Sequence, residues 1–126
     1  MEWSIDVNEE SAIITATLRG QWEAAGIMEA LHGLWTEQGR TGILRALWDF
    51  REVVASGVQT VDLRDVAAGH LTNRPNLPES RAAVVVSRDL EFGMARMIEV
   101  FMAESPVDMQ IFRDLGAACT WLDEGD

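Results

Sequence analysis

The chain has 126 residues, of which 48% are hydrophobic and 25% are charged, a composition typical of a folded domain rather than a disordered segment. Its 21 acidic and 10 basic residues give a formal net charge of −11, which repels nucleic-acid phosphates and anionic lipid headgroups, so we expect no nucleic-acid partner. The single cysteine, Cys119, excludes an internal disulfide and a multi-cysteine metal site, and we expect neither a metal nor a cofactor.

The ends and the hydropathy of the chain bear on where the protein works. The N-terminus is acidic and has no apolar run, unlike a signal peptide. No apolar stretch approaches the roughly 18 residues that a membrane span requires. We therefore expect a cytoplasmic protein without a transmembrane segment, folded as a single domain over residues 1–126.

Two strands and a helix are predicted in the first third of the chain. Residues 3–7 alternate apolar and polar side chains, and Ser11–Leu18 is rich in isoleucine and threonine, so both are predicted strands, the second ended by Gly20. From Trp22 to Gln38 the apolar period becomes helical, and Gly39 is a natural residue to follow a helix C-terminus. The apolar face of this helix is formed by Ala24, Ile27, Leu31, Leu34 and Trp35.

The middle of the chain predicts a buried strand and a short helix, each followed by a loop. Ile43–Phe50 is largely apolar, as expected for a strand covered on both faces, and residues 51–58 are expected to form a loop. Thr60 is suited to cap a helix over Val61–Leu71. The prolines and asparagines of residues 72–80 indicate a second loop.

The last third contains the clearest buried strand, Arg81–Ser87. A helix is expected to begin near Asp89, as its N-cap, and to end before Pro106. Val107–Phe112 is predicted as a fifth strand and Asp114–Leu122 as a terminal helix.

The complete order of predicted elements is ββαβαβαβα. Strands that alternate with helices favour parallel pairing through right-handed crossovers, and the short first connection adds an antiparallel hairpin. The sequence therefore predicts an α/β fold with a five-stranded mixed, mostly parallel sheet and four helices.

Two stretches resemble a known family. The segment RAAVVVSRDLEFGMARMIEVFMAESPVDMQIFRDLGAACTWL at Arg81–Leu122, together with LWDF at residues 47–50, is similar to the SpoIIAA-like family of small bacterial proteins, of the STAS/CRAL-TRIO type. The resemblance implies a small α/β domain with a mostly unassigned function and no catalytic motif. By analogy with related proteins it suggests lipophilic ligand binding or protein–protein signalling.

The signalling relatives, anti-sigma-factor antagonists, carry a phosphorylatable serine in an Asp-Ser-Ser-Gly type motif at the start of the second helix. The corresponding region of this chain contains Ser56 and Thr60 but not the motif. A phosphate on either residue could bind the amides of a helix N-terminus. The alternative, which we favour, is an unmodified loop serine and a structural helix cap.

A candidate site for a ligand lies on the inward face predicted for the helix over residues 61–71. His70 falls on that face with Leu63 and Val66, where it could hold the polar end of a ligand or could simply be a hydrogen-bonded core histidine. The adaptable side chains Met94, Met97 and Phe101 of the next helix would complete an apolar wall. We expect Cys119 to be a small buried hydrophobe rather than a nucleophile.

The segment FGMARMIEVFMAE at residues 92–104 is apolar on more than one side. Helical spacing gathers Leu90, Met94, Met97, Ile98 and Phe101 on a stripe expected to face the core, which Ala95 and Met102 widen. Phe92 and Val100 fall on the polar side of this helix, where they could contact a second subunit or a partner protein or belong to a mobile lid. Of these alternatives we expect an intermolecular contact through Phe92, Val100 and Met102, and a homodimer.

These observations lead to two alternative functions. The first is a binding domain that accommodates a lipophilic ligand or an apolar membrane-proximal surface. The second is a regulatory protein–protein interaction module of the anti-sigma-factor-antagonist type without the usual phosphoserine motif. An enzyme of unrecognised type is the third alternative, and we expect no enzymatic activity.

Overall fold

The computed structural model describes residues 1–73 and 78–124, and the side chains of residues 1–69 and 78–124 within them. Its elements follow the predicted order. They are β1 (Glu2–Asn8), β2 (Ile13–Gln21), α1 (Ala24–Thr41), β3 (Arg45–Val54), α2 (Thr60–Asn73), β4 (Ser80–Val85), α3 (Asp89–Phe101), β5 (Val107–Phe112) and α4 (Leu115–Glu124).

The five strands form one sheet in the order β1-β2-β3-β4-β5, so each strand pairs with its neighbour in sequence. The hairpin β1–β2 is antiparallel, and the other three pairs are parallel. The predicted α/β class and the mixed, mostly parallel sheet with four helices are confirmed.

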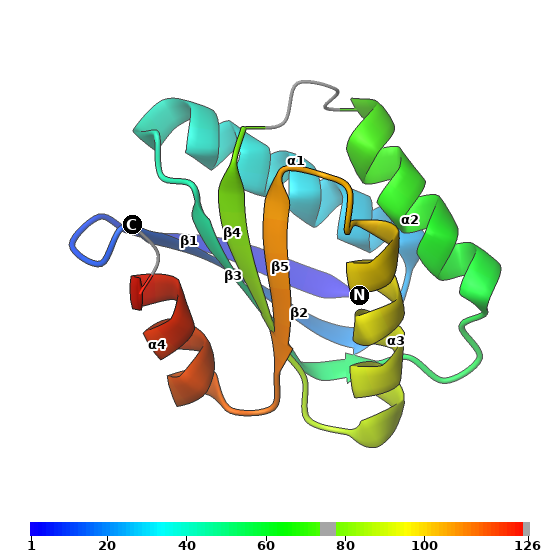
Figure 1. Cartoon of the computed structure of the whole chain (residues 1–126). Coiled ribbons are helices and arrows are strands. Elements are labelled where there is room, and N and C mark those ends of the chain that lie inside the picture. The colour runs from blue at the N-terminus through cyan, green and yellow to red at the C-terminus, as the bar shows by residue number, and fades with distance from the viewer. Residues whose placement is uncertain (74–77, 125–126) are drawn as a thin grey trace.

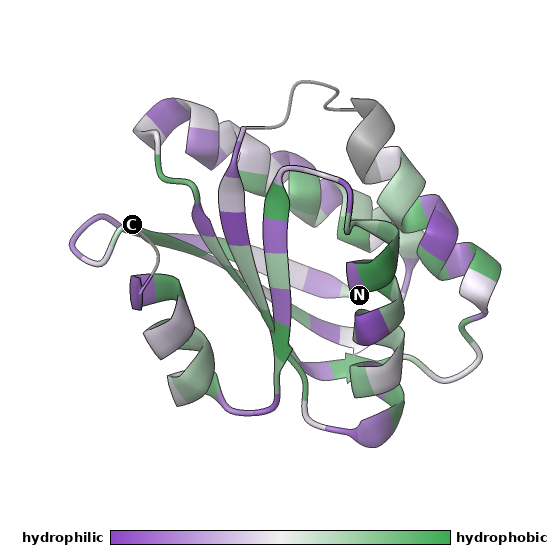
Figure 2. Cartoon of the chain, in the orientation of Figure 1, coloured by the Kyte–Doolittle hydropathy of each residue, from purple (hydrophilic) through white to green (hydrophobic). Residues whose placement is uncertain are grey.

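Helices cover the two faces of the sheet unequally (Figure 1). Helices α1, α2 and α3 pack on one face and α4 on the other, toward the β5 edge. Because successive side chains of a strand point to opposite faces, Ala46 and Trp48 of β3 join the core under α1–α3, whereas Leu47 joins the smaller core under α4. Figure 2 shows the same alternation along the edge strand β5, where Asp108 and Gln110 interrupt the apolar residues.

Several elements end later than predicted, among them β2, α1 and β3. The first helix runs through Gly39 to Thr41, and Gly42, at φ 77°, is the left-handed residue that ends it, its N–H donating to the Gln38 carbonyl. Gly20 does not end β2, which continues to Gln21 with φ +99° at this glycine. That extension pairs Gln21 with Val54, which belongs to β3.

The expected loop over residues 51–58 is therefore wrong for its first half. An irregular register between Thr17/Arg19 and Asp49/Glu52 adds one residue to β3, and the strand stays paired with β2 beyond it. The added residue lets Val53 return to the buried face. Of the loop expected over residues 72–80, the part at 74–77 lies outside the described residues.

The helix starts also differ from expectation. Thr60 is the first residue of α2, not its cap, and the preceding Gln59 N–H donates to the Asp62 carboxylate at 2.8 Å. Asp89 is likewise the first residue of α3, with Arg88 in the extended N-cap conformation. In both helices acidic side chains of the first turn, Asp62 in α2 and Asp89 with Glu91 in α3, lie near the positive end of the helix dipole.

Candidate functional site

A cavity of about 90 Å³ lies between the sheet and the three helices on its more covered face. Strands β3, β4 and β5 form its floor, and α1, α2 and α3 form its walls. Its lining residues are nearly all apolar: Trp22, Ile27, Leu31, Trp48, Phe50, Val53, Ala55, Leu63, Val66, Ala67, Val84, Glu91, Met94, Ala95, Ile98, Met102 and Met109.

The composition of the lining explains both the space and its adaptability. Small side chains such as Ala67 and Ala95 leave room opposite the large indole of Trp48. Three lining residues, Met94, Met102 and Met109, have flexible thioether side chains that can reshape the space around an apolar group. Met94 is only half-buried, as are Trp22 and several other lining residues, so the cavity is not sealed from solvent.

Met102 and Met109 also line a second, open groove at the C-terminal end of α3, together with Ser105, Pro106 and Val107. Two flexible side chains therefore separate the groove from the apolar cavity.

Glu91 is the one charged residue among the described residues that line the cavity, and only 5% of it is exposed. Its Oε2 accepts a hydrogen bond from the backbone N–H of Ala55 at 3.0 Å, and its Oε1 accepts one from Arg88 Nε at 2.8 Å. Arg88 Nη2 donates in turn to the Val53 carbonyl at 3.2 Å. These bonds join the first turn of α3 to the end of β3 at the carboxyl end of the parallel strands, where ligands of open α/β sheets commonly bind.

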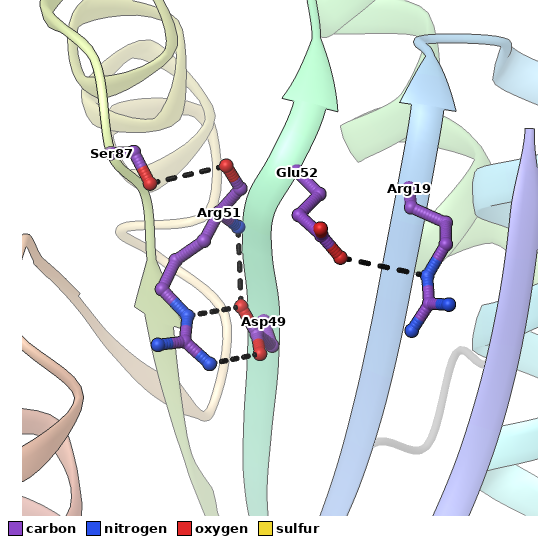
Figure 3. A network of polar contacts seen from close by, with 5 residues as sticks. All are labelled: Arg19, Asp49, Arg51, Glu52 and Ser87. Atoms are coloured by element: carbon purple, nitrogen blue, oxygen red, sulfur yellow. Dashed lines mark hydrogen bonds and ion pairs between the residues drawn. The ribbon is translucent and has the colours of Figure 1, made fainter.

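The opposite face of β3 carries a polar network (Figure 3). The Asp49 carboxylate accepts hydrogen bonds from Arg51 Nε at 2.9 Å and Arg51 Nη2 at 2.8 Å. These bonds and the nearby positive charge hold the pKa of Asp49 below its usual value and raise the pKa of Arg51. Arg19 pairs with Glu52 at 3.7 Å, and Ser87 donates to the Arg51 carbonyl at 3.1 Å. With polar side chains that pair with one another, the network covers the part of this sheet face on which no helix packs.

The residues predicted to bind a ligand are only partly brought together. Leu63, Val66 and Met94 line the cavity, whereas Met97 and Phe101 are not among its lining residues. Phe101 instead lies under the Arg64 guanidinium, 5.6 Å from ring centroid to guanidinium carbon. His70 belongs to α2, but its side chain lies outside the described residues.

The predicted orientation of α3 is wrong by about one position. Leu90, expected in the core, is 53% exposed, whereas Met102, expected at an intermolecular contact, is 2% exposed and faces the cavity. Phe92 is half-buried against the core with the Arg113 guanidinium 4.5 Å above its ring, so it does not point freely outward. Val100 is 67% exposed, as predicted. The residues of α3 that face the sheet are centred on Glu91, Ala95, Ile98 and the adjoining Met102.

The candidate phosphorylation positions lie in the connection between β3 and α2 and at the first residue of α2. Ser56 is exposed, and its carbonyl accepts a hydrogen bond from Gln21 Nε2 at 3.1 Å. Thr60 is exposed in the first turn of α2. Cys119 is half-buried and packs against the smaller core beside α4.

Sequence reasoning missed Glu91, Trp22 and Phe50 as cavity residues. A carboxylate in the first turn of a helix normally indicates a surface residue that faces the helix dipole, so Glu91 gave no separate signal. Its spacing from Arg88, three residues earlier, was the available clue to an ion pair, which the structure shows at 2.8 Å.

Within residues 1–73 and 78–124, no group of three His, Cys, Asp or Glu side chains is arranged to hold a metal ion. Over the same residues, none of the helices is long and apolar enough to cross a membrane.

Comparisons with known proteins identify the fold. No protein-family model matches the chain, and no curated protein matches its sequence. Among solved structures, the chain is similar to an uncharacterized protein of the DUF3478 family with a SpoIIAA-like fold from Shewanella loihica PV-4. The TM-score is 0.60 at 17% identity, over 96% of this chain and 92% of that chain. The SpoIIAA-like fold suggested by the residues is thus confirmed, and at this identity the likeness extends to the fold alone.

Proposed function

We propose that this SpoIIAA-like domain is a non-enzymatic binding protein whose cavity under α1–α3 accommodates an apolar ligand. The observation that carries the proposal is the cavity itself, which is lined almost wholly by apolar side chains in a core that would otherwise close. Native interiors are packed with few voids larger than a water molecule, because each void forfeits dispersion contacts. A retained cavity that opens toward solvent at half-buried residues is suited to a small hydrophobic guest.

The cavity volume limits the size of that guest. A dry engineered cavity of about 150 Å³ binds benzene, and the cavity here is about 90 Å³. Without rearrangement it suits a thin group, such as the end of an alkyl chain. Movement of Met102 or Met109 toward the adjoining groove would admit a longer chain.

Native mass spectrometry of freshly purified protein tests this proposal. We expect a non-covalent adduct that is lost on collisional activation, and the same spectra report the number of subunits. Two results together would contradict the proposal: mass spectra that show only the bare chain, and indole resonances of Trp22 and Trp48 that stay unchanged in saturating short alkanes and alkanols. Trp3 lies outside the cavity lining and serves as the internal control for solvent effects on the resonances.

A second function, a regulatory protein–protein interaction module, is favoured by one observation. Val100 and Leu90 expose apolar side chains on the outer side of α3. Exposed apolar residues on one helix are suited to a contact with a partner protein or a second copy of the chain. The two functions are distinguished by whether a ligand or a polypeptide copurifies with the protein.

A further inference from the structure

We propose that the cavity selects uncharged ligands that carry a hydrogen-bond donor, of the alkanol type, and rejects the corresponding carboxylates. This inference rests on the proposed function and adds to it the chemical class of the ligand. The reason is that Glu91, the one charged residue in the described lining, is itself a carboxylate.

Glu91 is built into the wall rather than free to leave it. Its side chain is 5% exposed and is held at both oxygens, by the Ala55 N–H at 3.0 Å and by Arg88 Nε at 2.8 Å. A carboxylate has about four acceptor positions, so these two bonds leave acceptor capacity for a ligand hydroxyl. An alkanol would therefore keep its hydroxyl hydrogen-bonded while its chain occupies the apolar space.

An anionic ligand would find no matching cation in the described lining. Arg88 is not a lining residue: its side chain is 54% exposed, and its guanidinium is already hydrogen-bonded to Glu91 and to the Val53 carbonyl. The positive end of α3 is already faced by Asp89 and Glu91 in its first turn. A second carboxylate beside Glu91 would thus be desolvated without a partner, which is costly in an apolar site.

The experiment compares two ligands of equal length, 1-pentanol and pentanoate, at pH 7, where a simple carboxylic acid is ionised. The readout is the indole ¹H–¹⁵N resonances of Trp22 and Trp48, which line the cavity, with Trp3 and Trp121 as internal controls outside the lining. We expect 1-pentanol to shift the two cavity resonances with a Kd at least about tenfold lower than that of pentanoate, the ratio that one charge-assisted hydrogen bond supplies. We expect Glu91→Gln to bring the two Kd values within about threefold, since it preserves the shape of the side chain and removes its charge.

The outcomes separate the two proposals. Equal affinities of the wild-type protein for the two ligands would overturn the selectivity and leave the binding function standing. If neither ligand shifts the indole resonances of Trp22 and Trp48, both the selectivity and the binding function are overturned. The wild-type comparison decides the matter by itself if Glu91→Gln fails to fold, and a pentanoate preference in the wild type would contradict the role of Glu91 outright.

Discussion

The Glu91 carboxylate of α3 accepts a hydrogen bond at 3.0 Å from the backbone N–H of Ala55, 36 residues earlier in the chain. Both residues are buried, and both line the cavity. The bond holds the N-terminus of a helix against the end of a central strand. The same carboxylate also accepts a hydrogen bond from Arg88, so one side chain ties the first turn of α3 both to Arg88 and to the residue that follows β3.

Glu91→Ala should lower the free energy of unfolding by about 1–3 kcal/mol, because it leaves the buried Ala55 N–H without its acceptor. Glu91→Gln should cost less, since an amide oxygen can still accept that bond. Urea denaturation monitored by tryptophan fluorescence measures both. Glu104→Ala, at an exposed position beyond α3, is the matched control and should stay within about 0.5 kcal/mol of wild type. Equal effects at positions 91 and 104 would show that the buried bond contributes nothing.

Ala67→Leu should fill part of the cavity and abolish binding of apolar ligands. Ala67 is buried and lines the cavity, and cavity-filling substitutions commonly stabilise by about 0.5–2 kcal/mol when the new side chain fits. Ala68→Leu, at the exposed neighbouring position of α2, adds the same side chain outside the cavity and is the control. We expect the native adduct to vanish from the first variant and to persist in the second. Binding retained by a folded Ala67→Leu protein would place the ligand elsewhere.

Asp49 should stabilise the folded protein at neutral pH, and this stabilisation should be lost as the pH falls. The hydrogen bonds from Arg51 lower the pKa of Asp49 in the folded protein below its value in the unfolded chain, so protonation of Asp49 favours unfolding. The difference in unfolding free energy between wild type and Asp49→Asn should be constant above about pH 5 and shrink below about pH 4. Arg51→Ala, which removes the cause of the lowered pKa, should reproduce the loss. A difference that is the same at pH 3 and pH 7 would contradict this account.

Val100→Ser tests the expected homodimer more cleanly than a change at Phe92. Phe92 packs against the core beneath Arg113, so its replacement would destabilise the monomer itself. Val100 is largely exposed, and its replacement should leave the unfolding free energy of a monomer within about 0.5 kcal/mol. We expect analytical ultracentrifugation to show a dimeric wild type, a monomeric Val100→Ser protein, and a dimeric Ala103→Ser control. A wild type that remains monomeric at high concentration would make Val100 an ordinary surface residue.

Asp62→Ala should destabilise α2 more than Thr60→Ala does. The carboxylate of Asp62 accepts from the Gln59 N–H at 2.8 Å and lies near the positive end of the helix, whereas Thr60 begins the helix without capping it. We expect losses of roughly 0.5–2 kcal/mol for Asp62→Ala and less than about 0.5 kcal/mol for Thr60→Ala, by thermal or urea unfolding. The reverse order would restore Thr60 as the cap.

A stoichiometric phosphate on Ser56 or Thr60 in protein from its native host would favour the signalling function.

The order and type of the elements could be predicted because they depend on short-range patterns. Alternating apolar residues mark β1 (Glu2–Asn8), continuous apolar residues mark the buried β4 (Ser80–Val85), and helical spacing marks α1 (Ala24–Thr41). The fold follows from that order, since short connections and right-handed crossovers allow few arrangements of alternating strands and helices. The SpoIIAA-like fold was therefore accessible from the residues alone.

The rotation of α3 and the cavity beneath it were decided only by the tertiary structure. This helix has apolar residues around most of its circumference, so its own pattern does not specify which side is buried. The orientation of α3 is fixed by contacts with residues distant in the sequence. Arg113 covers Phe92, Arg64 covers Phe101, and the Ala55 N–H donates to Glu91. Each contact joins residues that lie more than 20 positions apart in the chain, which a local pattern does not relate. The sequence by itself determined the set of elements and their order, and the packing of those elements determined which residues enclose the cavity.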